Sequence, residues 1–195
     1  MTEITTNTPF QISVWQRTWD KYDPEHMLTA LDKFRSTTEG VTRSNNGGYQ
    51  SKPDLARVFE LEPFFHWIAA TSEPILAALH IPFTNITIEH AWYNENVGLG
   101  QHNQPHIHDG ILSGVFYVDA PQGSGLLNLI NPAMNTLWQG HTQSTQHNQH
   151  TAEVARVVPT TGELYLWPSY LPHSVDPNTL ATTTRKSISF NLTAS

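Results

Sequence analysis

Gln104-Pro-His106-Ile-His108-Asp109-Gly110 runs directly into a nearly uninterrupted apolar stretch over residues 111–118, and this segment decides how the chain folds. Side chains alternate between the two faces of an extended chain, so His106 and His108 project from the same side. The two imidazoles therefore form a chelating pair beside a strand. The apolar run that follows is typical of a strand covered on both faces.

A third histidine, His173, lies far along the chain in Pro168-Ser-Tyr-Leu-Pro-His173-Ser-Val175, directly after a strand-like run over residues 162–167. Two close ligands and one distant histidine, each beside a strand-like segment, are the layout of a mononuclear metal site on a small β-barrel. We therefore expect His106, His108 and His173 to hold a catalytic metal ion.

The composition narrows the chemistry and the partners. The chain has no cysteine, 14% charged residues and a formal net charge of −7. Without thiolates, a bound metal must take nitrogen and oxygen ligands. The negative charge argues against binding to nucleic-acid phosphates or to an anionic membrane. The expected partner is a small-molecule or peptidyl substrate, with no nucleic acid and no membrane.

The length of 195 residues suits one domain. The first residues, Met-Thr-Glu-Ile-Thr-Thr-Asn, lack the basic and apolar regions of a signal peptide, and no apolar run approaches membrane-spanning length. We therefore expect a single cytoplasmic domain over residues 1–195. The sequence leaves its oligomeric state open.

Residues 1–82 are expected to provide helical support. Alternation over residues 10–15 predicts a half-buried first strand. Asp23-Pro24 predicts a helix N-cap followed by proline at the first helical position. A second helical pattern covers residues 63–80, and Pro74 predicts a kink or a break within it.

Residues 83–195 are expected to form a β-barrel core. Strand patterns cover residues 86–92, 111–118, 126–130, 162–167 and 186–192. A long loop over residues 131–161 is too polar to be core, and loops of this length are usually functional or disordered. The predicted fold class is α+β, with two or three N-terminal helices backing a double-layered antiparallel barrel.

The last strand pattern, Arg185-Lys-Ser-Ile-Ser-Phe-Asn-Leu192, carries polar residues on one face and apolar residues on the other. If the apolar face packs on the helices, Arg185 points into the barrel, where an unpaired buried charge would cost several kcal/mol. A carboxylate-bearing ligand held by Arg185 and Ser187 would neutralise that charge. The alternative is that this face is exposed to solvent and that Arg185 lies at the edge of the sheet.

Together these motifs resemble the iron(II)/2-oxoglutarate-dependent oxygenases, and more narrowly a group common in bacteria and phages. The resemblance covers roughly residues 85–192. Beside the histidine pair, its motifs are Ser113-Gly-Val-Phe-Tyr117, Pro168-Ser-Tyr-Leu-Pro-His-Ser-Val175 and Arg185-Lys-Ser-Ile-Ser-Phe-Asn191.

The resemblance implies a double-stranded β-helix, which is a jelly-roll or cupin-like barrel, with Fe(II) and 2-oxoglutarate as cofactors. It also implies a dioxygenase that hydroxylates an unidentified substrate and releases succinate and CO2. The iron ligands implied are His106, His108 and His173. The residues implied to bind 2-oxoglutarate are Arg185 and Ser187, assisted by Tyr117 and Asn191.

One position departs from the pattern of most members, which carry a carboxylate two residues after the first histidine. Here that residue is His108. Three neutral imidazoles leave the centre one charge unit more positive than the usual triad. Asp109 is the nearest carboxylate, but alternation turns it away from His106, so His108 is the preferred ligand.

Two other classes remain open from the residues alone. A cupin dioxygenase without 2-oxoglutarate shares a similar histidine pattern, but Leu112 and Ser113 stand where its motif needs glutamate. A non-enzymatic β-sandwich binding module would treat the histidines as ordinary polar groups. Arg185 separates these classes, because neither the cupin nor the binding module needs it.

Overall fold

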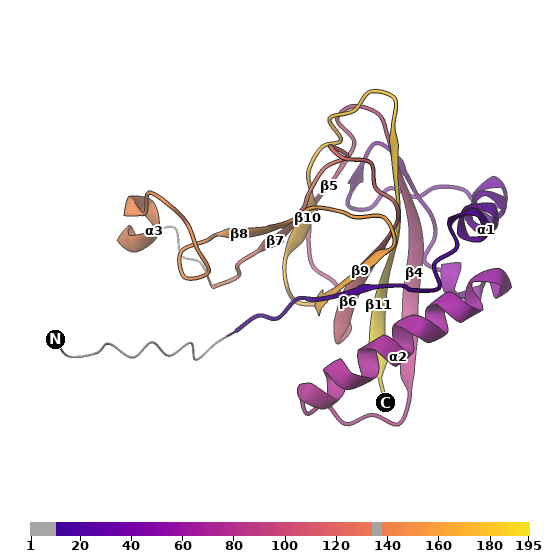
Figure 1. The fold of residues 1–195 in the computed structure, drawn as a ribbon, viewed down its shortest axis with the longest axis horizontal. Coiled ribbons are helices and arrows are strands. Elements are labelled where there is room, and N and C mark those ends of the chain that lie inside the picture. Colours follow the sequence, from indigo (N-terminus) through magenta and orange to yellow (C-terminus); the bar gives the residue numbers. More distant parts are fainter. Residues whose placement is uncertain (1–10, 134–137) are drawn as a thin grey trace.

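Two antiparallel sheets form the body of the protein (Figure 1). A computed structural model describes residues 11–133 and 138–195. The larger sheet has the order β1-β9-β6-β11-β4-β3 and comprises β1 (Trp15–Thr18), β9 (Glu163–Pro168), β6 (Leu112–Asp119), β11 (Thr184–Ala194), β4 (Ile86–Val97) and β3 (Tyr49–Gln50). The smaller sheet has the order β2-β5-β10-β7-β8 and comprises β2 (Asn45–Asn46), β5 (His102–His106), β10 (His173–Val175), β7 (Leu127–Ile130) and β8 (Val154–Val157). The fold is α+β with antiparallel sheets, as the sequence predicts.

Two helices cover the outer side of the larger sheet (Figure 1). They are α1 (Pro24–Thr37) and α2 (Glu62–Ala78). Two 3-10 turns, η1 (Leu55–Arg57) and η2 (Phe59–Leu61), come directly before α2. The predicted cap of α1 is confirmed, because the Asp23 side chain accepts a hydrogen bond of 3.1 Å from the backbone N–H of His26. This bond satisfies one of the free donors at the helix start.

Of the two alternatives at Pro74, a kink or a break, the break is wrong, because α2 continues through Pro74. Proline removes one backbone donor, but the helix buries Phe65, Ile68 and Leu76 against the sheet. Burial of one such apolar side chain contributes about 1.5–3 kcal/mol, so several of them together offset the roughly 3 kcal/mol cost of an interior proline.

Each face of the larger sheet packs into its own core. On the helix side, Phe116, Leu166 and Phe190 belong to a core that also contains Phe64 and Ile68 of α2. On the other side, a smaller core joins β6 and β9 to β7, and its buried members are Val115, Tyr117, Leu127, Leu129, Tyr165, Trp167 and Leu171. The nearly continuous apolar run of β6 is thereby explained, because both of its faces are covered.

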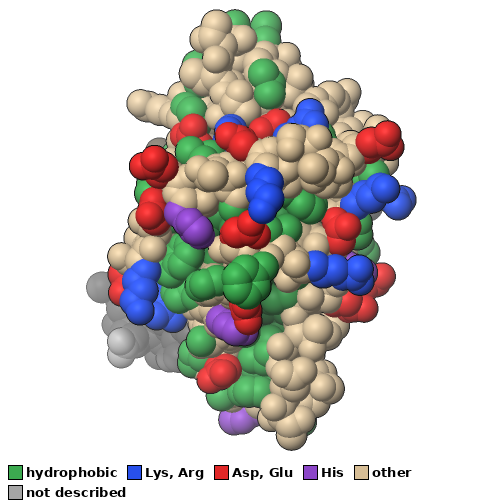
Figure 2. Space-filling model, turned by 90° about the vertical axis from the view of Figure 1, so that its right-hand side faces the viewer, with side chains coloured by type: hydrophobic (Ala, Val, Ile, Leu, Met, Phe, Trp, Pro, Cys, Tyr) green, Lys and Arg blue, Asp and Glu red, His purple; other side chains and the backbone are tan. Residues whose placement is uncertain are grey.

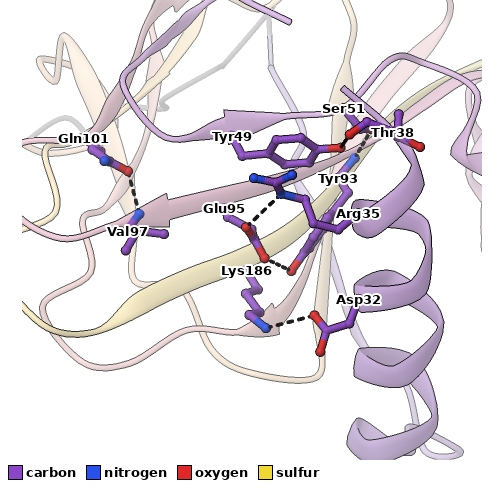
Figure 3. A network of polar contacts seen from close by, with 10 residues as sticks. All are labelled: Asp32, Arg35, Thr38, Tyr49, Ser51, Tyr93, Glu95, Val97, Gln101 and Lys186. Carbon is purple, nitrogen blue, oxygen red and sulfur yellow. Dashed lines mark hydrogen bonds and ion pairs between the residues drawn. The ribbon is translucent and has the colours of Figure 1, made fainter. Parts of the chain in front are cut away.

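A polar network fixes α1 against the outer face of β3, β4 and β11 (Figure 3). The Arg35 guanidinium lies 3.7 Å from the ring centroid of Tyr49 and its Nε lies 3.4 Å from a carboxylate oxygen of Glu95. Tyr93 donates a hydrogen bond of 2.8 Å to the same carboxylate. With Glu95 held outward, alternation turns its neighbour Asn94 toward the opposite face of the sheet.

The first 82 residues contribute β2 and β3 in addition to the expected helices and first strand. The first strand lies at Trp15–Thr18, not at residues 10–15, and Phe10 falls outside the described residues. Its position is set by pairing with β9, which extends the larger sheet by one strand. Local alternation cannot reveal that constraint.

The polar segment over residues 131–161 is more ordered than a plain loop. It includes β8, which pairs with β7, and the short helix α3 (Gln139–Gln143). β8 is the edge strand of the smaller sheet, and α3 lies beyond it, away from the helices (Figure 1). The polar sequence of this segment predicts a loop. A strand at the edge of a sheet can nevertheless form there, because it needs cross-strand hydrogen bonds but little apolar burial.

The face that carries the helices shows no gathering of charge of one sign (Figure 2). Acidic and basic side chains are interspersed there among hydrophobic ones (Figure 2). Within the described part of the chain, no helix is both long and apolar enough to span a bilayer.

Candidate metal centre and cavity

The three predicted histidines converge at one end of the space between the sheets. His106 is the last residue of β5, His108 follows two residues later, and His173 is the first residue of β10. His173 pairs directly with His106 in the sheet. One ligand nitrogen from each ring can be chosen so that all three lie within 4.8 Å of one another. This is close enough for a single metal ion to bind all three.

Backbone carbonyl groups orient two of the rings. Nδ1 of His106 lies 2.7 Å from the carbonyl oxygen of Gln104, and Nδ1 of His173 lies 3.0 Å from that of Leu171. A carbonyl oxygen only accepts hydrogen bonds, so each Nδ1 carries the proton. In the neutral imidazole this leaves Nε2 with a free lone pair, which is the state a metal ligand requires.

The surroundings keep these imidazoles uncharged. Burial lowers the pKa of His106, and burial together with the neighbouring histidines lowers the pKa of His108 to about 4 and that of His173 to about 3. At neutral pH the cluster therefore presents three neutral nitrogen donors. Such donors suit divalent transition-metal ions, including iron, and need no cysteine.

Aromatic side chains enclose the cluster. The ring of Trp92 lies 5.3 Å from that of His108, and the ring of Trp167 lies 4.9 Å from that of His173, measured between centroids. Both tryptophans are largely buried. Their packing limits the rotation of the His108 and His173 imidazoles.

Asp109 is not part of the cluster. Its side chain is exposed, whereas the half-buried His108 packs its ring against those of His106 and His173. Alternation after β5 thus turns Asp109 outward, as expected from the sequence. His102 also lies outside the cluster, with Nδ1 bonded to the carbonyl oxygen of Gly100 at 2.8 Å.

A cavity extends from the histidines into the space between the sheets. Its empty volume is about 490 Å³, counting the part that opens to solvent. Its wall includes all three histidines and, from the larger sheet, the side chains of Tyr117, Arg185 and Ser187. The structure therefore brings the candidate metal ligands and three of the four predicted cosubstrate residues to one cavity.

Arg185 is the principal charge in this wall. Its side chain is buried, with 1% of the residue exposed, and one of its amino groups donates a hydrogen bond of 2.8 Å to the carbonyl oxygen of Ser124. Among the described residues, no carboxylate oxygen lies within 4.0 Å of the guanidinium. Burial lowers the pKa of Arg185, although an arginine remains charged at neutral pH. The charge of Asp176 partly opposes this lowering, but its carboxylate does not lie within ion-pair distance. A buried cation without a direct ion pair is a fitting site for a ligand carboxylate.

Tyr117 and Ser187 lie beside this guanidinium. They face each other in the pairing of β6 with β11, and both are buried. Burial raises the pKa of Tyr117 to about 12, against a smaller lowering effect of the Arg185 charge. The Tyr117 hydroxyl is therefore protonated at neutral pH and can donate a hydrogen bond.

Asn191 has a different setting from the other predicted cosubstrate residues. Its side-chain oxygen accepts a hydrogen bond of 2.8 Å from the Ser113 hydroxyl, which also lies 2.9 Å from the Ser169 hydroxyl. Asn191 is not among the residues that line the cavity. This bond ties β11 to β6 near the loop that precedes His173.

Other residues of the cavity wall are not assigned to the site by the sequence patterns, among them Trp92, Asn94 and Trp167. Alternation along β4 places Trp92 and Asn94 on one face, and this signal was available. The sequence does not show which face of β4 turns inward, because that depends on where α1 packs.

A family model described as "Putative 2OG-Fe(II) oxygenase" matches residues 90–191, which is just over half of the chain. No curated protein sequence matches the chain. Two solved structures with a similar fold are prolyl hydroxylases. The enzyme from Pseudomonas putida has a TM-score of 0.61 and 15% identity, covering 91% of each chain. The Trichoplax adhaerens enzyme, solved with a fragment of the oxygen degradation domain of hypoxia inducible factor, has a TM-score of 0.61 and 14% identity, covering 93% of this chain and 83% of that one.

A third similar structure is HygX from Streptomyces hygroscopicus, solved with nickel, 2-oxoglutarate and hygromycin B, with a TM-score of 0.57 and 11% identity over 94% of this chain and 84% of that one. At these identities the structures show a shared fold, and the family model carries the assignment. The family's cofactors fit the site, which offers three nitrogen donors and a buried cation without a direct ion pair in one cavity. The chain belongs to the 2OG-Fe(II) oxygenases, oxidoreductases whose cofactors are iron and 2-oxoglutarate.

Proposed function

We propose that this protein is a dioxygenase of the hydroxylase type, which hydroxylates a C–H bond of its substrate and converts 2-oxoglutarate to succinate and CO2. The observation that carries the proposal is the joint placement of the three histidines and the buried Arg185 in one cavity. A cupin without 2-oxoglutarate would need the histidines alone. A binding module would need neither.

The two sheets are proposed to form a double-stranded β-helix as one domain over residues 1–195. The strand order in each sheet and the similar structures support this architecture. In that arrangement the metal centre and the cosubstrate share the interior between the sheets, and the helices brace the outer side of the larger sheet. The proposed site therefore combines residues of both sheets and forms only when the chain is folded.

His106, His108 and His173 are proposed to bind Fe(II) through one ring nitrogen each. Iron bound there would supply the oxidising chemistry, by activating dioxygen while 2-oxoglutarate is oxidatively decarboxylated. Three protein ligands would leave room at the ion for other ligands, such as the cosubstrate. Because all three are neutral, the protein adds no negative charge to the ion, unlike a triad with a carboxylate.

Arg185 and Ser187 are proposed to bind the distal carboxylate of 2-oxoglutarate, with Tyr117 as a further donor. The guanidinium provides paired N–H groups that match a carboxylate, and the two hydroxyls stay protonated at neutral pH. Asn191 is proposed to assist indirectly, by holding β11 and β6 in register through Ser113.

The substrate is proposed to be a small molecule or a peptidyl side chain that approaches from the open side of the cavity. Ser44 and Asn103 lie in the cavity wall, next to the pairing of β2 with β5. We infer that the segment over residues 47–53 and the extension over residues 131–161 shape the entrance. Loops positioned by a rigid scaffold commonly carry specificity.

The proposal is tested by anaerobic titration of the protein with Fe(II) and then with 2-oxoglutarate. A weak visible charge-transfer band should develop with one equivalent of each, and succinate should be released when oxygen is admitted. Stoichiometric iron binding without any response to 2-oxoglutarate would favour the cupin alternative. Absence of both responses would favour a non-enzymatic binding module.

A further inference from the structure

Asn94 is a buried amide in the cavity wall whose present contacts leave one of its polar atoms without a partner. The residue is 6% exposed and lies on β4. Its Nδ2 donates a hydrogen bond of 3.1 Å to the Ser189 hydroxyl. Its Oδ1 is buried and has no hydrogen-bond partner among the described residues.

A buried amide oxygen without a partner costs about 1–3 kcal/mol. The two ends of an asparagine amide have nearly the same shape, so the hydrogen-bond network decides which end is which. If the amide is turned round, Oδ1 accepts the hydrogen bond of the Ser189 hydroxyl, which can act as donor or acceptor. This orientation satisfies the oxygen and leaves an N–H donor for a ligand in the cavity.

The strand register places Asn94 level with residues already assigned to the cosubstrate. Ser187 is directly opposite Asn94 in the pairing of β4 with β11, and it is opposite Tyr117 in the pairing of β11 with β6. The three side chains form one row across three strands. Trp92, two residues before Asn94 on the same face, is the residue that packs on His108. Asn94 therefore lies two residues farther along β4 from the metal centre than Trp92.

The chemistry of the expected ligand also calls for another donor. A carboxylate has about four lone-pair directions, whereas Arg185 already donates from one amino group to Ser124. The row formed by Asn94, Ser187 and Tyr117 would place three neutral donors around the group that the guanidinium binds. Such a set satisfies a buried carboxylate more fully than the guanidinium alone.

We propose that Asn94 binds 2-oxoglutarate by donating a hydrogen bond from its side-chain amide to the distal carboxylate. This inference rests on the proposed function, since it assigns a further residue of the same site. It adds a residue that the last-strand motif does not contain.

The test is an anaerobic titration of the Fe(II)-loaded protein with 2-oxoglutarate and, separately, with pyruvate, which lacks the distal carboxylate. Iron binding is measured first for each variant. In Asn94→Ala, the affinity for 2-oxoglutarate should fall about 10- to 100-fold, as for the loss of a hydrogen bond to a charged group. The affinity for pyruvate should stay within about twofold. Asn85→Ala, which truncates an exposed asparagine outside the cavity wall, just before β4, is the control and should keep its affinity for 2-oxoglutarate.

Asn94→Asp keeps the size of the side chain and its contact with Ser189, so it serves if the alanine variant does not fold. Its negative charge should lower the affinity for 2-oxoglutarate at least 100-fold while iron still binds. A change of less than threefold in either folded variant would overturn the role of Asn94, as would an equal loss for pyruvate or in Asn85→Ala. If the unmodified protein binds iron but not 2-oxoglutarate, the proposed function itself fails.

Discussion

His173 and His106 face each other in the pairing of β10 with β5, and their ring centroids lie 4.3 Å apart although 67 positions of sequence separate them. The main-chain hydrogen bonds of the smaller sheet therefore set the distance between two metal ligands. The third, His108, joins them from the same chain segment as His106. A site built in this way is preorganised, because the sheet holds its geometry without a bound ion.

Removal of His173 should abolish stoichiometric metal binding. His173→Ala leaves two ligands from one chain segment and no donor from β10, so the affinity should fall more than about 100-fold, beyond the 10- to 100-fold typical of losing a supporting partner. Binding of Fe(II), or of Co(II) as a spectroscopic probe, measures this under anaerobic conditions. His102→Ala should bind as tightly as the unmodified protein, since this ring lies outside the cluster.

Substitution of His108 and of Asp109 should have opposite outcomes. His108→Ala should weaken metal binding strongly, whereas Asp109→Asn should change the affinity less than about twofold, because an exposed carboxylate outside the cluster contributes little. Metal titration of the two variants compares them directly. If Asp109→Asn loses the metal and His108→Ala keeps it, the ligand set named above is wrong.

Replacement of Arg185 should weaken cosubstrate binding and leave the metal in place. The expected loss of 2-oxoglutarate affinity in Arg185→Ala is about 100-fold or more, as for the removal of one partner of a buried charge pair. Lys186→Ala is the control, since this neighbour lies on the other face of β11 and forms an ion pair with Asp32 at a distance of 3.5 Å. Equal affinities in both variants and the unmodified protein would rule out the role of Arg185.

Metal affinity should be nearly flat between pH 7.5 and pH 6. Burial lowers the pKa of His108 to about 4 and that of His173 to about 3, and it also lowers the pKa of His106. Three histidines of ordinary pKa would take up protons over this range and lose roughly 50-fold in affinity. Because the lowered pKa values keep these rings unprotonated, we expect a loss below about fivefold. Metal titrations at several pH values would measure it, and a 50-fold loss would show that the rings titrate as exposed ones do.

Gly114→Ala should destabilise the fold by about 1–3 kcal/mol, which is typical of overpacking in a core. A Cβ atom at this position would lie 2.5 Å from the Phe190 ring and 2.9 Å from both a Leu166 methyl group and the backbone oxygen of Tyr165. Urea unfolding followed by circular dichroism measures the loss. Phe190→Leu should restore part of the stability when combined with Gly114→Ala, because it removes the shortest of these contacts. Strict additivity of the two substitutions would contradict the proposed clash.

The family and the chemistry of the site were predictable from short local patterns. The spacing of His106 and His108, the distant His173 and the polar face that contains Arg185 and Ser187 are all sequence features, and the family assignment is confirmed. The cap at Asp23 is also local and was predicted correctly. Such features depend on alternation, capping and residue type, which act over a few residues.

The positions of β1 and β8 and the continuity of α2 could not be read in the same way. Each depends on what the segment packs or pairs with, namely β9, β7 and the larger sheet. Burial of apolar side chains by tertiary contacts outweighs a local breaker such as Pro74.

By itself the sequence determined which residue types are available to hold a metal ion and an anion, because side-chain chemistry is a property of each residue. Only the tertiary structure decided that β5 and β10 lie side by side, that Arg185 is buried without a carboxylate partner and that Asn94 lies level with Ser187. The physical reason is that strand pairing and helix packing act between segments far apart in the chain. They alone fix which face of each strand turns inward.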